Sequence, residues 1–303
     1  MAGETAFGAW QKEIFARHGA GEFREALNVL SSPPPDLTPA QWARADFWAA
    51  CLRATLGEPE AAVEALERVR DRGDWFAPVL LERDADLSPI RDHPRFVALL
   101  AAWRERQRVE AGRHQPSLTL LEPEGTPSGT LIALHGNAGT SEALRSHYAD
   151  LAGEGWRVAL AGSGQYGGPE AFVWDDAAQA DAEAGEWTRG LGGRPIWAGF
   201  SAGAGVALRN VITGAVPASG VLAVAPSLAA DLRWWPESPA QVPVALVLGE
   251  ADPHTARALV LAERLRAVNA PVREWMHAGG HTHPKDWETV RAGALAWLAA
   301  PPA

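Results

Sequence analysis

The sequence has almost no cysteine. Of its 303 residues only Cys51 carries a thiol, so no disulfide can form within the chain. Structural disulfides are typical of secreted proteins, and the first residues show no basic segment that leads into an apolar run and a cleavage site. We therefore expect a cytoplasmic protein.

Basic residues and long hydrophobic runs are also scarce. The chain has 27 Lys and Arg against 37 Asp and Glu, a formal net charge of −10, without a basic cluster. Binding to nucleic acid needs a basic surface, so we expect no nucleic-acid partner. The longest apolar stretches, residues 220–226 and 294–300, are much shorter than the roughly 20 residues that span a bilayer. We expect no membrane partner either.

Tryptophan, in contrast, is abundant. Its 14 copies are spread along the whole chain, which indicates that most of them pack structural elements together and mark no single site. Hydrophobic residues make up 47% of the sequence, enough for a full-sized core. The length allows one large domain, or one medium domain with a smaller partner.

Apolar residues up to about residue 112 recur at three- and four-residue spacing, which predicts amphipathic helices. Thr38 followed by Pro39 and Gln41 predicts a helix N-terminus with a capping box. Residues 21–27 also echo residues 57–63. The sequence separation between these two segments is close to the length of a helical-hairpin repeat. We predict a helical domain over residues 1–112.

Residues 5–72 of this region resemble degenerate tetratricopeptide repeats, in which glycine permits a tight turn and alanine lets two helices pack closely. The resemblance leaves two roles open. The region is either a helical appendage that packs on the second domain, or it forms a groove for a protein or peptide partner.

The pattern changes at about residue 116 to short β-rich apolar runs, with helical stretches such as 141–152 and 255–268 between most of them. Buried strands that alternate with amphipathic helices predict a mainly parallel sheet with helices on both faces. The second domain is therefore predicted to be α/β, over residues 116–303. Its strands are expected at 117–121, 130–134, 157–161, 195–199, 221–224, 242–248 and 272–275.

One of these strands runs directly into Gly199-Phe200-Ser201-Ala202-Gly203, and the residues from Val206 onward read as a helix. A nucleophile on such a sharp turn needs glycines two residues before and after it, because side chains there would clash. The N-terminus of the following helix also favours a developing oxyanion. We predict that Ser201 is a catalytic nucleophile.

A nucleophilic serine needs a histidine that accepts its proton and an acid that orients the histidine. Glu250 and Asp252 directly follow one predicted strand, and His277, His281 and His283 follow the next. The carboxyl ends of parallel strands meet at one edge of a sheet, where the three kinds of residue would gather.

Asp252, beyond the strand end and before a helix, is the predicted acid, with Glu250 as the alternative. His281 is the predicted base because two glycines before it allow a close loop approach. His277 is expected to belong to the strand, and His283 to begin the last helix.

The tetrahedral intermediate of acyl transfer needs two backbone donors. The Ala202 N–H is one candidate, and the glycine-rich loop of residues 135–140 supplies the other, for which we choose the N–H of Asn137. His135 in this loop is expected to be structural. Triad spacing accounts for the histidines and carboxylates, so we expect neither a metal nor a cofactor.

With these motifs, residues 116–300 resemble the α/β-hydrolase superfamily, and within it phospholipase/carboxylesterase-like and dienelactone-hydrolase-like serine hydrolases. Dienelactone hydrolases use a cysteine where this chain has Ser201, and many carboxylesterases of this group have a glutamine where it has Ala202. The resemblance implies hydrolysis of small-molecule esters through an acyl-enzyme. Thioester or amide cleavage, or a non-catalytic scaffold for a tetratricopeptide-type binding surface, are the alternatives.

Four aromatic residues in two loops are predicted to form walls for an apolar acyl or aryl group. The alternative is that they pin surface loops onto the domain. They are Tyr166, Trp174, Trp234 and Trp235.

Overall fold

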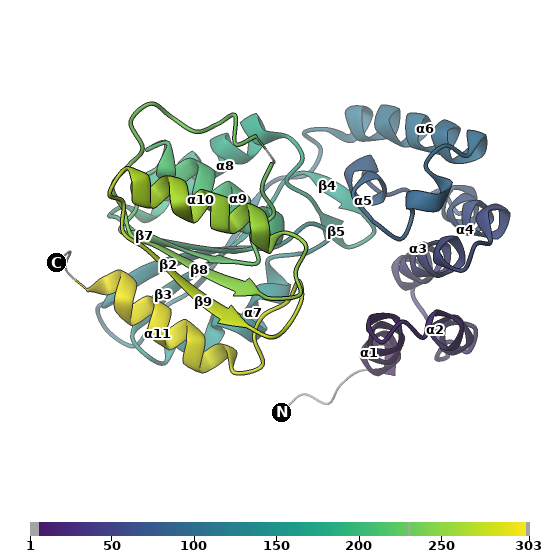
Figure 1. Ribbon diagram of the computed structural model, residues 1–303, viewed down its shortest axis with the longest axis horizontal. Helices are drawn as coiled ribbons and strands as arrows, with labels where there is room; N and C mark the ends of the chain where they lie inside the picture. The colour runs from purple at the N-terminus through teal and green to yellow at the C-terminus, as the bar shows by residue number, and fades with distance from the viewer. Residues whose placement is uncertain (1–5, 230, 301–303) are drawn as a thin grey trace. The chain divides into compact units, whose positions relative to one another are not determined.

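The computed structural model describes residues 6–229 and 231–300. The chain divides into two compact units (Figure 1). The first contains the residues up to Ala111 together with Tyr166–Ala171, and the second contains Gly112–Gln165 and the residues from Phe172 onward. A short segment from the second half of the chain thus belongs to the first unit.

The part of the first unit that precedes Gly112 is built from helices, as the apolar spacing predicted. The predicted capping box is present, because Gln41 N donates to Thr38 Oγ1 and Thr38 N donates to Gln41 Oε1. The tetratricopeptide-type repeat stays a prediction. The helices are α1 (Ala6–Gly19), α2 (Phe23–Leu30), α3 (Pro39–Thr55), α4 (Pro59–Asp71), α5 (Pro78–Glu82) and α6 (Pro94–Glu110), with the 3-10 helix η1 (Ser88–Ile90) before α6.

The second unit contains a mainly parallel sheet, which confirms the predicted fold class. Its strand order among the described residues is β1-β3-β2-β6-β7-β8-β9. The edge strand β1 is antiparallel to β3, and the other neighbours are parallel. The strands are β1 (Ser117–Leu121), β2 (Gly129–Leu134), β3 (Trp156–Gly162), β6 (Ile196–Phe200), β7 (Gly220–Val224), β8 (Val244–Gly249) and β9 (Val272–His277).

Helices cover both faces of this sheet (Figure 1), because alternate strand residues point to opposite sides. Ile132 and Leu134 pack into one buried cluster, and Leu131 and Ala133 into the other. The first cluster includes residues of α8 (Ala177–Leu191), α9 (Ser201–Ile212) and α10 (Thr255–Ala267). The second includes residues of α7 (Arg145–Tyr148) and α11 (Trp287–Ala299).

The helix expected over residues 141–152 is a broken series of short turns, η2 (Glu142–Leu144), α7 and η3 (Ala149–Ala152). At Tyr148 the backbone φ of −137° lies outside the helical range. The Tyr148 ring is buried and packs edge-on against Trp287 of α11. The apolar pattern indicates one helix here, and the structure breaks it where the Tyr148 ring packs against α11.

Another departure is a β-hairpin in a segment that was expected to be a loop. It consists of β4 (Tyr166–Gly168) and β5 (Ala171–Phe172), which pair as a two-stranded sheet. Strands of two or three residues are too short to show the alternation by which a strand is recognised.

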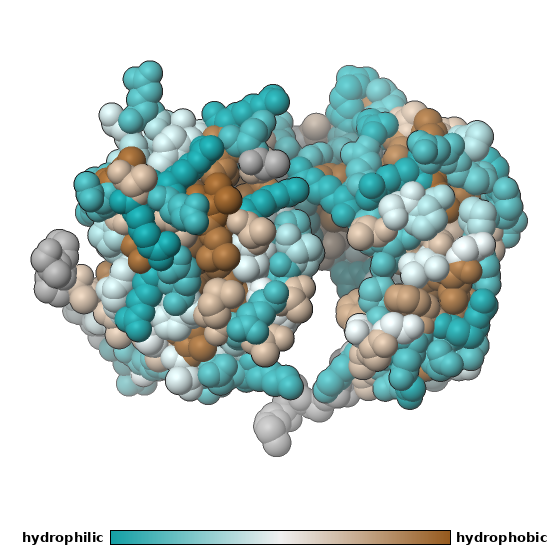
Figure 2. Space-filling model, viewed as in Figure 1, coloured by the Kyte–Doolittle hydropathy of each residue, from teal (hydrophilic) through white to brown (hydrophobic). Residues whose placement is uncertain are grey.

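The face shown in Figure 2 is mainly hydrophilic, with hydrophobic residues in smaller patches. None of the helices among the described residues combines the length and the hydrophobicity needed to span a bilayer.

Candidate active site

Ser201 lies at the junction of β6 and α9 and is the first residue of that helix. Its φ is +53°, whereas Phe200 before it is extended with φ −117° and ψ 139°. A positive φ is unfavourable for serine, so the surrounding structure must hold this conformation. The chain thereby turns sharply from strand to helix, at the carboxyl edge of the parallel strands.

The turn at Ser201 lies against the loop that follows β2. A Cβ added at Gly203 would lie 2.3 Å from the His135 carbonyl oxygen, and one added at Gly136 would lie 3.2 Å from Ser201 Cβ. Only residues without a side chain allow this approach. The glycines therefore bring the backbone of residues 135–139, which we call the oxyanion loop, beside the serine.

His281 connects Ser201 to Asp252. Its Nε2 lies 2.8 Å from Ser201 Oγ, and its Nδ1 lies 2.8 Å from Asp252 Oδ2. The Asp252 side chain is 1% exposed. When Nδ1 donates to this buried carboxylate, Nε2 has a free lone pair that can accept the serine proton.

The loops that present the acid and the histidine are tied together by their backbones. Glu250 N donates to His277 O, and Ala251 N donates to Gly279 O. The second oxygen of Asp252, Oδ1, accepts a hydrogen bond from His254 N at 2.9 Å. Glu250, the alternative acid, is exposed, and the structure brings Asp252 to His281 instead.

The other two histidines of this region have different surroundings. His277 ends β9, and its Nδ1 accepts a hydrogen bond from Gly279 N. His283 does not begin the last helix, because α11 starts at Trp287. This expectation was wrong, since the proline at position 284 disfavours helical geometry in the residue before it.

His283 instead belongs to a column of rings that ends at His281. It stacks on His147 with ring centroids 3.9 Å apart and on Phe200 at 4.9 Å, and Phe200 packs against His281 at 5.2 Å. Burial, together with the charges of the neighbouring His147 and His277, lowers the pKa of His283 to about 3, so the ring is neutral at neutral pH. The sequence contains no signal that links His147 to this site.

His135 at the start of the oxyanion loop is 2% exposed. Its Nδ1 donates to Gly136 O, and its Nε2 accepts from Ser163 N. Burial lowers the pKa of His135 to about 4, which keeps the ring neutral. These contacts are those of a structural residue.

The two predicted oxyanion donors lie in neighbouring segments. Ala202 is in the first turn of α9, and Asn137 is in the oxyanion loop, where the following Ala138 has a φ of +61°. The Asn137 side chain is fixed, because its Oδ1 accepts a hydrogen bond from Trp174 N at 2.9 Å. The role of the two N–H groups as donors stays a prediction.

The four aromatic residues predicted to contact substrate do not form one cluster. Trp174 is 8% exposed, and its indole N–H donates to His135 O at 2.7 Å. Tyr166 belongs to the first unit, where its ring lies 5.5 Å from that of Trp75. Trp234 and Trp235 neighbour each other at 6.3 Å and are partly buried against the core of the second unit.

Two groups among the described residues bring possible metal ligands within 4.8 Å of one another. One contains Asp252, His254 and His281, so that metal binding there would compete with the contacts that His281 makes to Ser201 and Asp252. The other is in the first unit and consists of Cys51, Asp84 and Asp86. Burial raises the pKa of the Cys51 thiol well above its usual value and also raises the pKa of Asp84.

No protein-family model matches the sequence, and neither does any curated protein. Among solved structures, an uncharacterized protein from Bacillus cereus is 19% identical with a TM-score of 0.53, over 96% of this chain and 99% of that one. Esterase PE8 is 19% identical with a TM-score of 0.51, over 61% of this chain and 99% of its own. Esterase 2 from Thermogutta terrifontis, phosphorylated by paraoxon, is 16% identical with a TM-score of 0.50, over 63% and 93%. These likenesses show that the second unit has the α/β-hydrolase fold.

Proposed function

We propose that the protein is a serine hydrolase that cleaves carboxylic esters of small molecules. The observation that carries this proposal is the hydrogen-bonded series from Ser201 Oγ through His281 to Asp252, with both distances 2.8 Å. This geometry meets the requirement that the base lie within hydrogen-bond reach of the proton it removes.

In the proposed first half-reaction, His281 Nε2 takes the hydroxyl proton as Ser201 Oγ attacks the ester carbonyl carbon. The oxyanion of the tetrahedral intermediate accepts hydrogen bonds from the N–H groups of Ala202 and Asn137. When the bond to the alcohol oxygen breaks, His281 gives its proton to that oxygen, and the alcohol leaves. Asp252 holds the imidazole and stabilises its charged form.

In the second half-reaction His281 removes a proton from water as the water oxygen attacks the acyl-enzyme. Collapse of the second intermediate breaks the bond to Ser201 Oγ, which recovers its proton from His281. The products are the carboxylic acid and the free enzyme. No cofactor takes part in this scheme.

Esters are favoured over thioesters and amides because esterase PE8 and the Thermogutta terrifontis esterase share the fold of the second unit. Trp234 and Trp235 as walls for the acyl group stay a prediction, because they are partly buried against the core and Trp235 lies beside Arg264 in the last turn of α10. A protein or peptide partner at the helical unit stays a prediction.

A substrate panel tests the proposal. Wild-type protein should hydrolyse p-nitrophenyl esters faster than matched thioesters and anilides, and Ser201→Ala should lower kcat by about 10⁴-fold or more without loss of the fold. Trp234→Ala should change the ratio of kcat/KM between decanoate and acetate esters, leaving kcat on acetate intact. Full activity of Ser201→Ala would exclude the mechanism, and a folded but inactive wild type would favour the non-catalytic scaffold.

A further inference from the structure

A segment of the chain that follows β3 makes contacts in both compact units. We call residues 165–176 the strap. Its middle part, Tyr166–Ala171, belongs to the first unit, whereas Gln165 and the residues from Phe172 onward belong to the second. The contacts of its middle part and of its two ends indicate the role of the strap.

The middle of the strap is anchored to helices of the first unit. Ala77 N donates to Gly167 O at 2.8 Å, at the residue before α5. The Arg44 guanidinium, from α3, donates to Glu170 O at 2.9 Å. The rings of Trp75 and Tyr166 lie 5.5 Å apart. The two hydrogen bonds hold the backbone of the hairpin at β4 and at the turn, and the ring contact adds a side-chain anchor at Tyr166.

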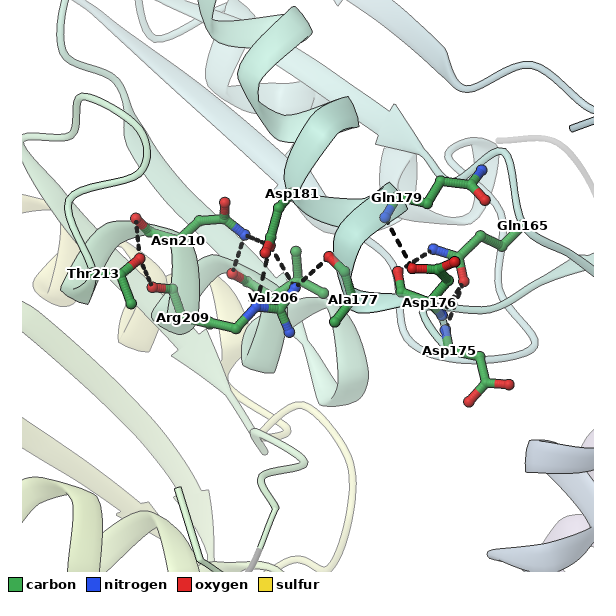
Figure 3. A network of polar contacts seen from close by, with 10 residues as sticks. All are labelled: Gln165, Asp175, Asp176, Ala177, Gln179, Asp181, Val206, Arg209, Asn210 and Thr213. Carbon is green, nitrogen blue, oxygen red and sulfur yellow. Dashed lines mark hydrogen bonds and ion pairs between the residues drawn. The ribbon is translucent and has the colours of Figure 1, made fainter. Parts of the chain in front are cut away.

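The two ends of the strap are tied to each other. Gln165 Oε1 accepts hydrogen bonds from the backbone N–H groups of Asp175 and Asp176, both at 2.7 Å, and Gln165 Nε2 donates to Asp176 O (Figure 3). In addition, Val173 N donates to Gln165 O. The strap is therefore a loop whose two ends are joined by hydrogen bonds.

Beyond its end the strap continues into α8, which is bound to the helix of the nucleophile. Asp181 Oδ1 of α8 accepts hydrogen bonds from Asn210 Nδ2 at 2.7 Å and from the guanidinium of Arg209, both on α9 (Figure 3). Since α9 begins at Ser201, these hydrogen bonds fix the position of α8, into which the strap continues, relative to Ser201.

The C-terminal part of the strap holds the oxyanion loop through three hydrogen bonds. Phe172 N donates to Gly139 O at 3.0 Å, Trp174 N donates to Asn137 Oδ1 at 2.9 Å, and Trp174 Nε1 donates to His135 O at 2.7 Å. They fix the beginning, middle and end of the loop. An oxyanion donor is effective only if it is already in place when charge develops, so such bonds bear directly on rate.

From these contacts we infer that the helical unit serves catalysis by anchoring the strap, and that the strap holds the Asn137 N–H in position for the oxyanion. Arg44 and Ala77 are thus positioning residues for the reaction. The inference rests on the proposed function for its catalytic part. The mechanical part, that the anchors steady the oxyanion loop, stands on the contacts alone.

The test removes the anchors in the full-length protein. Arg44→Ala removes the donor to Glu170 O, and Ala77→Pro removes the N–H that binds Gly167 O. Proline suits position 77, where φ is −58° and ψ is 130°. The two substitutions are combined in a double variant. If the double variant does not fold, Arg44→Ala alone is the test variant. Arg24→Ala is the matched control, because it breaks an ion pair of the same unit, with Glu58, that does not touch the strap.

Two readouts are measured on each variant: hydrogen exchange of the peptide that covers residues 135–139, and kcat and KM on an ester. The double variant should exchange about tenfold faster in this peptide and lose about tenfold in kcat, with KM changed less than about twofold. Arg24→Ala should match wild type in both.

Unchanged exchange in the double variant would overturn the inference. Faster exchange with full kcat would also overturn it, because the anchors would then not serve catalysis. If wild-type protein hydrolyses no ester, the proposed function fails, and the exchange measurement still decides whether the anchors hold the loop.

Discussion

The loops on the two sides of Ser201 are held by different means. On one side, the side chains of His281 and Asp252 meet it through hydrogen bonds of 2.8 Å, on loops that directly follow β9 and β8. On the other side, the oxyanion loop is held through its backbone and the Asn137 amide, by the strap. A substitution on the base side removes a chemical group, whereas one on the oxyanion side misplaces a group that remains. A substitution on the oxyanion side should therefore lower kcat much less than one on the base side.

The largest effect is expected on the base side. Asp252→Asn should keep the fold and lower kcat by about 10⁴-fold, because an amide donates where the carboxylate accepts and so favours the wrong tautomer of His281. Steady-state kinetics on a short ester measures the loss. Glu250→Gln is the matched control, since Glu250 is exposed and should be dispensable. A large loss in Glu250→Gln and a small one in Asp252→Asn would reassign the acid.

A smaller effect is expected on the oxyanion side. Trp174→Phe keeps a ring but removes the indole N–H that donates to His135 O. We expect kcat to fall by about tenfold with little change in KM, because the loop loses one restraint and no substrate contact. Trp187→Phe, at a buried ring that packs edge-on against Trp174, controls for loss of aromatic packing.

If Trp174 instead contacts the acyl group, Trp174→Phe should change KM and the preference for chain length. A series of esters from acetate to decanoate separates the two outcomes.

A further effect concerns stability instead of rate, because each side includes a buried, neutral imidazole. Burial lowers the pKa of His135 to about 4 and that of His283 to about 3, from 6.5. Below pH 6.5 the unfolded chain binds protons that the folded chain excludes. Stability should therefore be full above pH 6.5 and fall as the pH drops toward 4, by on the order of 3 kcal/mol for His135.

Urea unfolding at pH 7.5, 6 and 5 measures this loss. In His283→Phe the ring column keeps an aromatic side chain without the titrating nitrogen, so the fall in stability between pH 6.5 and 5 should shrink. An equally steep fall in this variant would contradict the assignment to His283.

The residues that the structure brings together at Ser201 could be named from the sequence because each follows an apolar strand directly. The order of serine, acid and histidine, with the glycines that flank the serine, is a local pattern. The parallel sheet could also be predicted from a local pattern, because buried strands and amphipathic helices alternate along the chain.

The strap could not be predicted, because it depends on contacts between distant residues. Arg44 and Glu170 are separated by 126 positions, and the β4–β5 hairpin is too short to show a period. The type of Trp174 and its place in a loop predict a substrate wall, whereas its burial against His135 depends on how the strap closes. The column of His283, His147 and Phe200 likewise has no local signature.

The most direct test of the central claim is covalent labelling with a fluorophosphonate, which reacts with serines activated by a base. Wild-type protein should gain the mass of one adduct, which peptide mapping should locate at Ser201. The reaction should disappear in Ser201→Ala and slow by several orders of magnitude in His281→Gln. Folded wild-type protein that stays unlabelled, or an adduct on another serine, would contradict the assignment of Ser201 as the nucleophile.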